Sequence, residues 1–306
     1  MKVSLIATVK DGAAHIQEFL GSIEAQTRAP DEVIVVDGGS TDGTVDLLGL
    51  AERLTLIEER GANIARGRNV AIAAATHDVI AVTDADCVLE PAWLERILEP
   101  IEAGADVSMG FYLPVTDGFL QECLAAVNLP LDASEVDPAR FMPSARSVAF
   151  RRGAIEAAGG YPEWLDIGED MWVDHRWREL GLDLRFAPEA VVRWRLRPTL
   201  GATWAQYFRY ARGDALAGMH PERHAIRFGT YASLGAALGS RKRWPKAVAV
   251  AGALAYARAP VRRAWRRMPD ARERAAAAIV VPALLGWIDT AKMAGYAAGL
   301  IERTRR

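Results

Sequence analysis

Apolar runs and amphipathic stretches alternate along the first 110 residues. Short runs rich in Val, Ile and Leu predict strands at residues 3–9, 32–37, 53–58 and 78–83. Between them, apolar residues recur at helical spacing near residues 13–26, 42–50 and 62–75. This rhythm is typical of a mostly parallel sheet flanked by helices, so the pattern predicts an α/β fold.

The middle of the chain is less regular. Extended patterns resume at residues 105–113, 146–150 and 184–194. Residues 168–181 predict a helix, because acids occupy its first turn and a glycine ends it. Since neither an internal repeat nor a low-complexity linker interrupts this part, we predict one catalytic domain over residues 1–235 and a helical tail over residues 236–306.

The composition indicates the cellular compartment of the protein. Hydrophobic residues make up 51% of the chain and charged residues 25%, as in an ordinary globular protein. Cys87 and Cys123 are the only cysteines, which excludes a disulfide framework and fits a reducing environment. We therefore expect a cytoplasmic protein.

Positive charge is concentrated in the tail. From Ser240 to Arg306 there are 15 Lys and Arg residues against 4 Asp and Glu residues, a net charge of +11 in a chain of net charge −2. Its apolar stretches, residues 247–257 and 275–288, are shorter than the roughly 20 residues of a membrane-spanning helix, and Pro282 interrupts the second.

Tryptophans lie among the cationic residues of this tail. The combination predicts a helical segment that lies peripherally on an anionic membrane surface, at the inner face of the cell membrane. A cap packed on the main domain and a homodimer interface are the alternatives. No base-reading motif accompanies the charge, which argues against nucleic acid as a partner.

Two carboxylates directly follow a strand in "VIAVTDADC", residues 79–87. In an extended chain Asp84 and Asp86 point to the same face, and two like charges that close are costly unless a cation or water lies between them. Oxygen ligands of this kind suit Mg²⁺ or Mn²⁺. A polar turn after a buried strand is the alternative.

Three further groups of polar residues are candidates for chemistry. Asp37 ends a strand before glycines whose spacing is not that of a dinucleotide site. Arg66 and Arg68 open a helix, where the dipole disfavours cations. An anionic ligand such as a diphosphate would explain them, and ordinary surface arginines are the commoner alternative. Glu169 and Asp170 follow Gly168 at a helix start and could accept a proton or simply cap the helix.

The order of these features resembles that of a family 2 glycosyltransferase with the GT-A, Rossmann-like fold. The resemblance covers roughly residues 3–215. It rests on the segments "ATVKDG", "VIVVDGGSTDGT", "ARGRN", "VTDADC", "SVAFRR", "GGYPEWLDIGEDMWVDHRW" and "WAQYFRYARGD", which follow one another as they do in that family.

The resemblance implies roles for matching residues. Thr8, Val9 and Asp37 would line the pocket for the nucleotide, and Arg68 would approach the base or the phosphates. Asp86 would bind a divalent cation, and Asp84 would contact the ribose or the metal site. Asp170, with Glu169 beside it, matches the Glu-Asp motif whose Asp is the general base of inverting members.

Three departures from the family pattern refine these expectations. Lys10-Asp11 stands where Asn-Glu is usual, and Trp194 replaces a histidine that often contacts the metal. The Gln-x-x-Arg-Trp motif of processive synthases is absent, since Tyr210 takes the place of its Trp, which favours addition of a single sugar.

The implied function is inverting, metal-dependent transfer of a hexosyl-type sugar from a UDP- or GDP-sugar to a hydroxyl of a lipid-linked or polysaccharide acceptor. A sugar nucleotidyltransferase is an alternative, although "ATVKDGAAH" lacks the Gly-rich phosphate loop that such enzymes carry after the first strand. A non-catalytic sugar-nucleotide-binding protein is another alternative.

Overall fold

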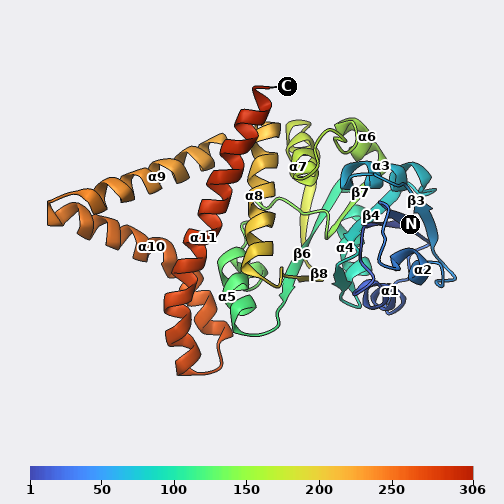
Figure 1. Ribbon diagram of the computed structural model, residues 1–306. Coiled ribbons are helices and arrows are strands. Elements are labelled where there is room, and N and C mark those ends of the chain that lie inside the picture. Colours follow the sequence, from blue (N-terminus) through green and yellow to red (C-terminus); the bar gives the residue numbers. More distant parts are fainter. Residues whose placement is uncertain (306) are drawn as a thin grey trace. The chain divides into compact units, whose positions relative to one another are not determined.

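The computed structural model describes residues 1–305, which divide into two compact units (Figure 1). The sheet unit comprises residues 1–115 and 132–195, and the helical unit comprises residues 116–131 and 196–305. The strands are β1 (Val3–Val9), β2 (Glu32–Asp37), β3 (Thr55–Glu58), β4 (Val79–Asp84), β5 (Cys87–Leu89), β6 (Val107–Val115), β7 (Val148–Arg151) and β8 (Leu184–Arg195). Helices of the sheet unit are α1 (Ile16–Glu24), α2 (Thr44–Leu48), α3 (Ile64–Ala74), α4 (Trp93–Glu102), α6 (Arg152–Ala158) and α7 (Glu169–Glu179), with a 3₁₀ turn at Ala133–Glu135. The helical unit contains α5 (Phe119–Asn128), α8 (Leu200–Ala217), α9 (Pro221–Gly239), α10 (Arg243–Arg267) and α11 (Ala271–Arg303).

Among residues 1–305, eight strands form one mixed sheet in the order β3-β2-β1-β4-β7-β6-β8-β5. The first four are parallel, as the alternating pattern predicted. β7 runs antiparallel to both of its neighbours, and β5 runs antiparallel to β8. The mostly parallel α/β architecture is confirmed, while the antiparallel strand β5 was not predicted.

The sheet curls so that two strands adjacent in the sequence lie far apart in the strand order. β4 ends at Asp84 and β5 begins at Cys87, yet three strands separate them in the sheet. Because only two residues join them, the β5–β8 edge must return to the carboxyl end of β4. Cys87 pairs with Trp194 there, which brings a residue of β8 to the candidate acids.

Apolar side chains fill both faces of the central strands. Ile6 and Ile80 are buried with Trp177 of α7 in one core cluster, and their neighbours Leu5 and Ala81, which point to the opposite face, are buried as well. Gly67 lets α3 approach β1 closely, since a Cβ at this position would lie 2.9 Å from the Thr8 Cγ2. The core therefore fixes α3 and α7 beside the carboxyl ends of β1 and β4.

Helix α11 is longer than the sequence indicated. It continues through Pro282, so the predicted interruption was wrong. One proline removes one hydrogen bond and costs about 3 kcal/mol, which packing of this 33-residue helix along α8 can offset. By length and composition alone, α11 could cross a membrane.

Two glycines allow α11 to pack tightly on α8. A Cβ at Gly295 would lie 2.0 Å from the Phe208 carbonyl oxygen, and one at Gly299 would lie 2.6 Å from the Arg212 carbonyl oxygen. This four-residue spacing of small residues is typical of helices whose backbones touch. Because α8 packs so closely on α11, residues 200–217 group with the tail, and the compact units divide at residue 195 instead of 235. The extent of the catalytic domain stays a prediction.

Candidate active site

The carboxyl ends of β1, β2 and β4 meet at one edge of the sheet. In the register of these strands, Thr8 lies between Val36 and Asp84, and Val9 lies opposite Asp37. Parallel sheets bind ligands beyond this edge. The structure thus brings together Thr8, Val9, Asp37 and Asp84, the four strand-end residues that the sequence singled out.

Asp37 shapes the loop that follows β2. Its Oδ1 accepts hydrogen bonds from the backbone N–H groups of Gly39 and Ser40, both at 2.8 Å, and its Oδ2 accepts from the Ser40 hydroxyl. The Asp37 side chain is 1% exposed. Asp37 would therefore affect a bound ligand by fixing the conformation of this loop.

Arg68 joins the two acid motifs. It is 1% exposed, and its Nη2 donates a hydrogen bond to the Asp84 Oδ1 at 2.7 Å while its Nη1 donates to the Glu169 Oε1. Burial alone would lower the pKa of Arg68, but the charges of Asp84 and Glu169 outweigh burial and raise it. The guanidinium stays positive and holds the end of β4 to the start of α7.

The surroundings of Arg68 fix its position further. Its guanidinium carbon lies 5.3 Å from the centroid of the buried Tyr161 ring. The Asn69 side chain exchanges two hydrogen bonds with the Tyr161 backbone, at 2.8 and 2.9 Å, so the loop that carries Tyr161 is tied to α3.

Arg66, the other arginine of this helix start, has a different environment. It is exposed, and it pairs with Glu59 at 2.8 Å and with Glu163 at 3.3 Å. Both arginines that were predicted to attract an anion therefore have carboxylate partners within the protein.

Asp86 lies in a turn and not in a strand. β4 ends at Asp84, Ala85 and Asp86 form the turn, and the Cys87 thiol lies 3.7 Å from the Asp86 Oδ1. Among residues 1–305, no group of three or more His, Cys, Asp or Glu side chains is placed to hold a metal ion. Mg²⁺ and similar ions are commonly held by one or two carboxylates together with substrate phosphates and water, so the pair fits such an ion.

Arg146 is a second cation beside Asp84. Its Nε lies 3.8 Å from the Asp84 Oδ2, and its guanidinium carbon lies 4.2 Å from the centroid of the Trp194 ring. The Ser144 hydroxyl accepts a hydrogen bond of 2.7 Å from its Nη1. Since Asp84 lies between Arg68 and Arg146, a further cation is attracted to it less strongly than to an isolated carboxylate.

Three acids lie along the first turns of α7. Burial raises the pKa of Glu169 to about 7, and the charge of Asp170 adds to this while Arg68 opposes it. Asp170 is half-buried and accepts hydrogen bonds from the Ala145 N–H at 3.5 Å and the Met171 N–H at 2.8 Å. Asp174 is buried one turn later, and burial raises its pKa well above the ordinary value. Asp170 is thus the most accessible carboxylate of the three.

Comparison with known proteins identifies the chain. The family model for Glycosyl transferase family 2 matches residues 4–155. Glycosyltransferase AglE of Haloferax volcanii is 28% identical over 223 residues, 69% of this chain and 72% of that protein. The O-antigen chain rhamnosyltransferase RfbN of Salmonella typhimurium is 27% identical over 225 residues, 68% of this chain and 71% of that protein. The chain belongs to glycosyltransferase family 2.

The fold of this glycosyltransferase is also found among solved structures. The mannosyltransferase PcManGT from Pyrobaculum calidifontis, in complex with GDP-Man and Mn²⁺, aligns over 99% of this chain and 87% of that chain. The TM-score is 0.54 and the sequence identity is 21%. The predicted GT-A fold is confirmed, with its curled mixed sheet and a helical C-terminal region.

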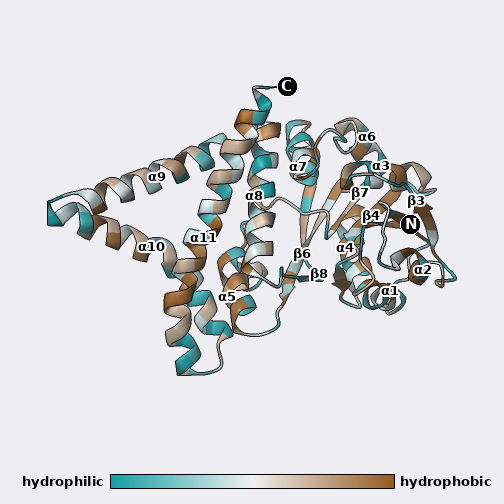
Figure 2. Ribbon diagram, in the orientation of Figure 1, coloured by the Kyte–Doolittle hydropathy of each residue, from teal (hydrophilic) through white to brown (hydrophobic). Residues whose placement is uncertain are grey.

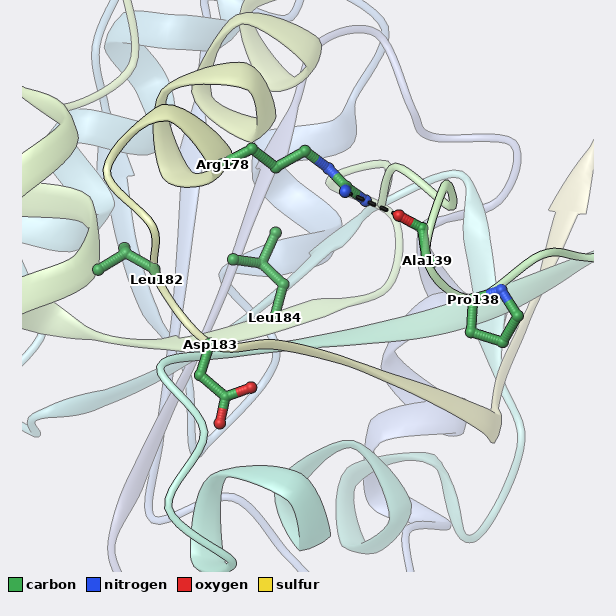
Figure 3. Close-up of a pocket in the computed structure, with 6 residues that line it drawn as sticks. All are labelled: Pro138, Ala139, Arg178, Leu182, Asp183 and Leu184. Atoms are coloured by element: carbon green, nitrogen blue, oxygen red, sulfur yellow. Dashed lines mark hydrogen bonds between the residues drawn. The ribbon is translucent and has the colours of Figure 1, made fainter.

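A cavity of about 350 Å³ in this glycosyltransferase lies away from the candidate residues. Figure 3 shows Arg178 reaching the Ala139 carbonyl oxygen, with Leu184 below it and Asp183 pointing away. In the strand register Leu184 is level with Ile80, near the amino end of β4, whereas Asp84 ends that strand. The cavity therefore opens near the amino ends of the parallel strands, and the donor site is not expected there.

Sequence reasoning missed three residues of the candidate site: Arg146, Tyr161 and Asp174. Asp174 could have been found, because it follows Asp170 by one helical turn. Tyr161 lies in a segment that carries the family resemblance and Arg146 directly precedes another, but nothing in the local sequence showed which side chains they would contact.

Proposed function

We propose that this family 2 enzyme is an inverting, metal-dependent glycosyltransferase that moves a hexosyl-type sugar from a UDP- or GDP-sugar to an acceptor hydroxyl. The observation that carries the proposal is the link through Arg68. Its guanidinium binds Asp84, which precedes Asp86 by two residues, and Glu169, which precedes Asp170. One buried cation thereby holds a cation-binding acid pair beside a candidate base.

Asp86 is the proposed ligand of a divalent cation, Mn²⁺ or Mg²⁺, with Asp84 beside it. A bound ion would place positive charge next to the diphosphate that leaves the sugar. Thr8, Val9 and the Asp37 loop line the edge where the nucleotide would bind. Since Arg68 is buried between two carboxylates, its proposed role changes from direct donor contact to positioning of both acids.

Asp170 is the proposed general base. It takes the proton of the acceptor hydroxyl while the acceptor oxygen forms a bond to the anomeric carbon. The bond from that carbon to the phosphate oxygen breaks on the opposite face, and its electron pair stays with the diphosphate. Attack opposite to the departing group inverts the anomeric configuration.

Arg146 is proposed to stabilise the departing diphosphate. Its stacking on Trp194 keeps a cation at the edge of the site, and charge-assisted donors of this kind favour charge that develops in the transition state. The family resemblance implies that Trp194 replaces a histidine that often contacts the metal, and Arg146 is proposed to supply positive charge at this place instead.

The acceptor is proposed to be a lipid-linked or polysaccharide hydroxyl in cell envelope synthesis, at the inner face of the cell membrane. The similarity to an O-antigen chain rhamnosyltransferase supports this class of acceptor. Addition of a single sugar is expected, since the motif of processive synthases is absent from the sequence.

The test is a donor screen that measures hydrolysis and transfer from UDP- and GDP-sugars with and without Mn²⁺. Asp86→Ala and Asp170→Asn should each abolish transfer, and the product of the wild type should have the inverted anomeric configuration. Asp46→Asn, an exposed acid on α2, is the matched control and should turn over normally. Normal turnover in both site variants would refute the assignment.

A further inference from the structure

Helices α9 and α10 form an extension with little packing of its own. Figure 1 shows them joined at one end and separating toward α11, within the helical unit. Across residues 225–256, which we call the arm, every side chain is exposed or half-buried. The arm therefore lacks the core that stabilises the other helices of this unit.

The arm is fixed at its base by Asp289 of α11. This carboxylate is 3% exposed and accepts hydrogen bonds from Arg227 at 2.8 Å, Tyr231 at 3.1 Å and Tyr256 at 2.9 Å. Arg227 and Tyr231 belong to α9, and Tyr256 belongs to α10. Both helices are thus attached to Asp289, and the residues between Tyr231 and Tyr256 extend away from this attachment.

The extended part is apolar although it is exposed. Leu238, Val248 and Leu254 are between 56% and 67% exposed. Burial of such a side chain stabilises a protein, and the arm lacks this stabilisation at each of these positions in water. Figure 2 shows hydrophobic patches along both helices and a hydrophilic tip. Helices with apolar residues on all sides are normally covered by an apolar medium.

The charge of the arm is of one sign. From Arg223 to Pro269, a stretch that includes the arm and the residues on either side of it, the sequence contains 11 Lys and Arg residues and no Asp or Glu. The cations flank the apolar middle of the arm at both ends. Those at the tip are exposed and comprise Arg241, Lys242, Arg243 and Lys246.

From these observations we propose that the arm lies flat in the headgroup region of an anionic lipid bilayer. The apolar part of α9, residues 228–239, rises about 18 Å, which is too short to cross roughly 30 Å of hydrocarbon. Insertion tip first would bury four cations. The flat orientation places the aliphatic side chains at the acyl boundary and the cations of both ends at lipid phosphates.

Other binding partners fit the positive charge and the exposed apolar side chains of the arm less well. A second copy would bring an arm of the same positive charge against this one, and a nucleic acid would leave the aliphatic side chains in water. The inference rests on the proposed function, because a membrane-linked acceptor is what gives the arm its use.

The test is flotation of the full chain with vesicles of phosphatidylcholine alone and of phosphatidylcholine mixed with phosphatidylglycerol. The wild type should bind only the anionic vesicles, and less at high salt. The triple variant Arg241→Glu, Lys242→Glu, Arg243→Glu should lose roughly 100-fold or more in affinity, at about 1 kcal/mol for each cation. Val248→Ser with Leu254→Ser should also weaken binding, and circular dichroism should show that both variants keep their helices.

A charge-reversal control distinguishes an effect of the arm on vesicle binding from an effect of the net charge of the protein. Arg60→Glu with Arg140→Glu changes two highly exposed cations of the sheet unit and should leave vesicle binding intact. Binding of the tip variant equal to wild type would overturn the proposal, as would vesicle-independent dimerisation that needs the arm. Donor hydrolysis in vesicle-free solution tests the proposed function separately, since no arm variant should change it.

Discussion

Both units of the molecule contain a buried charged residue that joins several elements: Arg68 in the sheet unit and Asp289 in the helical unit. In the sheet unit, Arg68 is held by the carboxylates of Asp84 and Glu169. In the helical unit, Asp289 accepts hydrogen bonds from three side chains on two helices. Both arrangements satisfy the same requirement, because a buried charge is tolerated only when it is paired and hydrogen-bonded.

The difference between the two lies in their neighbours. The partners of Arg68 adjoin accessible acids, Asp86 and Asp170, whereas the partners of Asp289 are an arginine and two tyrosines at the base of the arm. A buried ion pair alone is therefore no sign of catalysis. The comparison predicts that disruption of Arg68 affects both folding and turnover, and disruption of Asp289 affects folding and the arm.

The largest expected effect is on turnover in the sheet unit. Asp170→Asn should lower kcat about 10²- to 10⁴-fold, because general base catalysis is lost. Asp174→Asn, one turn further along α7, should keep its turnover, since burial raises the pKa of Asp174 and an amide resembles the protonated acid. Steady-state kinetics of both variants measure this, and an equal loss in both would contradict the assignment of the base.

Arg68→Met should destabilise the protein by about 3 to 5 kcal/mol, because two carboxylates lose their buried partner. Arg66→Met removes exposed pairs from the same helix and should cost about 0 to 1 kcal/mol. Urea denaturation gives both values. A small effect of Arg68→Met, similar to that of Arg66→Met, would show that the buried pairs are not needed for folding.

Asp289→Asn should destabilise the helical unit by about 2 to 3 kcal/mol, since Arg227 loses its charged partner. Hydrogen exchange should increase in residues 225–256, and turnover at low temperature should stay normal. Loss of turnover in the folded variant would show that Asp289 is not confined to a structural role.

The smallest expected effect is a pH dependence of stability. The pKa of Glu169 is raised from 4.5 to about 7, so the folded protein keeps a proton that the unfolded chain has lost between these values. The free energy of unfolding should therefore fall as pH rises from 4.5 to 7, by on the order of 2 kcal/mol, and the slope should be shallower in Glu169→Gln. Identical slopes in both proteins would mean that Glu169 does not titrate in this window.

The sequence predicted those parts of the fold in which local pattern and tertiary structure agree. The parallel strands β1, β2 and β4 and the acid-led helix α7 were found because buried strands and helix starts have local signatures. The short strand β5 was missed because its partner, β8, lies about 100 residues away in the chain. Pro282 was misjudged as a break, since only packing along α8 explains the uninterrupted helix.

The sequence predicted which residues form the candidate site better than it predicted the contacts among them. Asp84, Asp86 and Asp170 were identified from position, but the burial of Arg68 between two acids depends on Glu169, 101 residues away. The stacking of Arg146 on Trp194 depends likewise on the curl of the sheet. Such long-range pairs leave no periodic trace in a single sequence.

The central claim is that Asp86 and Asp170 have separate tasks in one site. Calorimetry of UDP and GDP binding, with and without Mn²⁺, tests it most directly in the wild type, Asp86→Ala and Asp170→Asn. We predict that Asp170→Asn keeps the Mn²⁺-dependent affinity of the wild type while its transfer activity is lost, and that Asp86→Ala loses the Mn²⁺ dependence. Mn²⁺-dependent binding that survives in Asp86→Ala, or is lost in Asp170→Asn, would contradict this division.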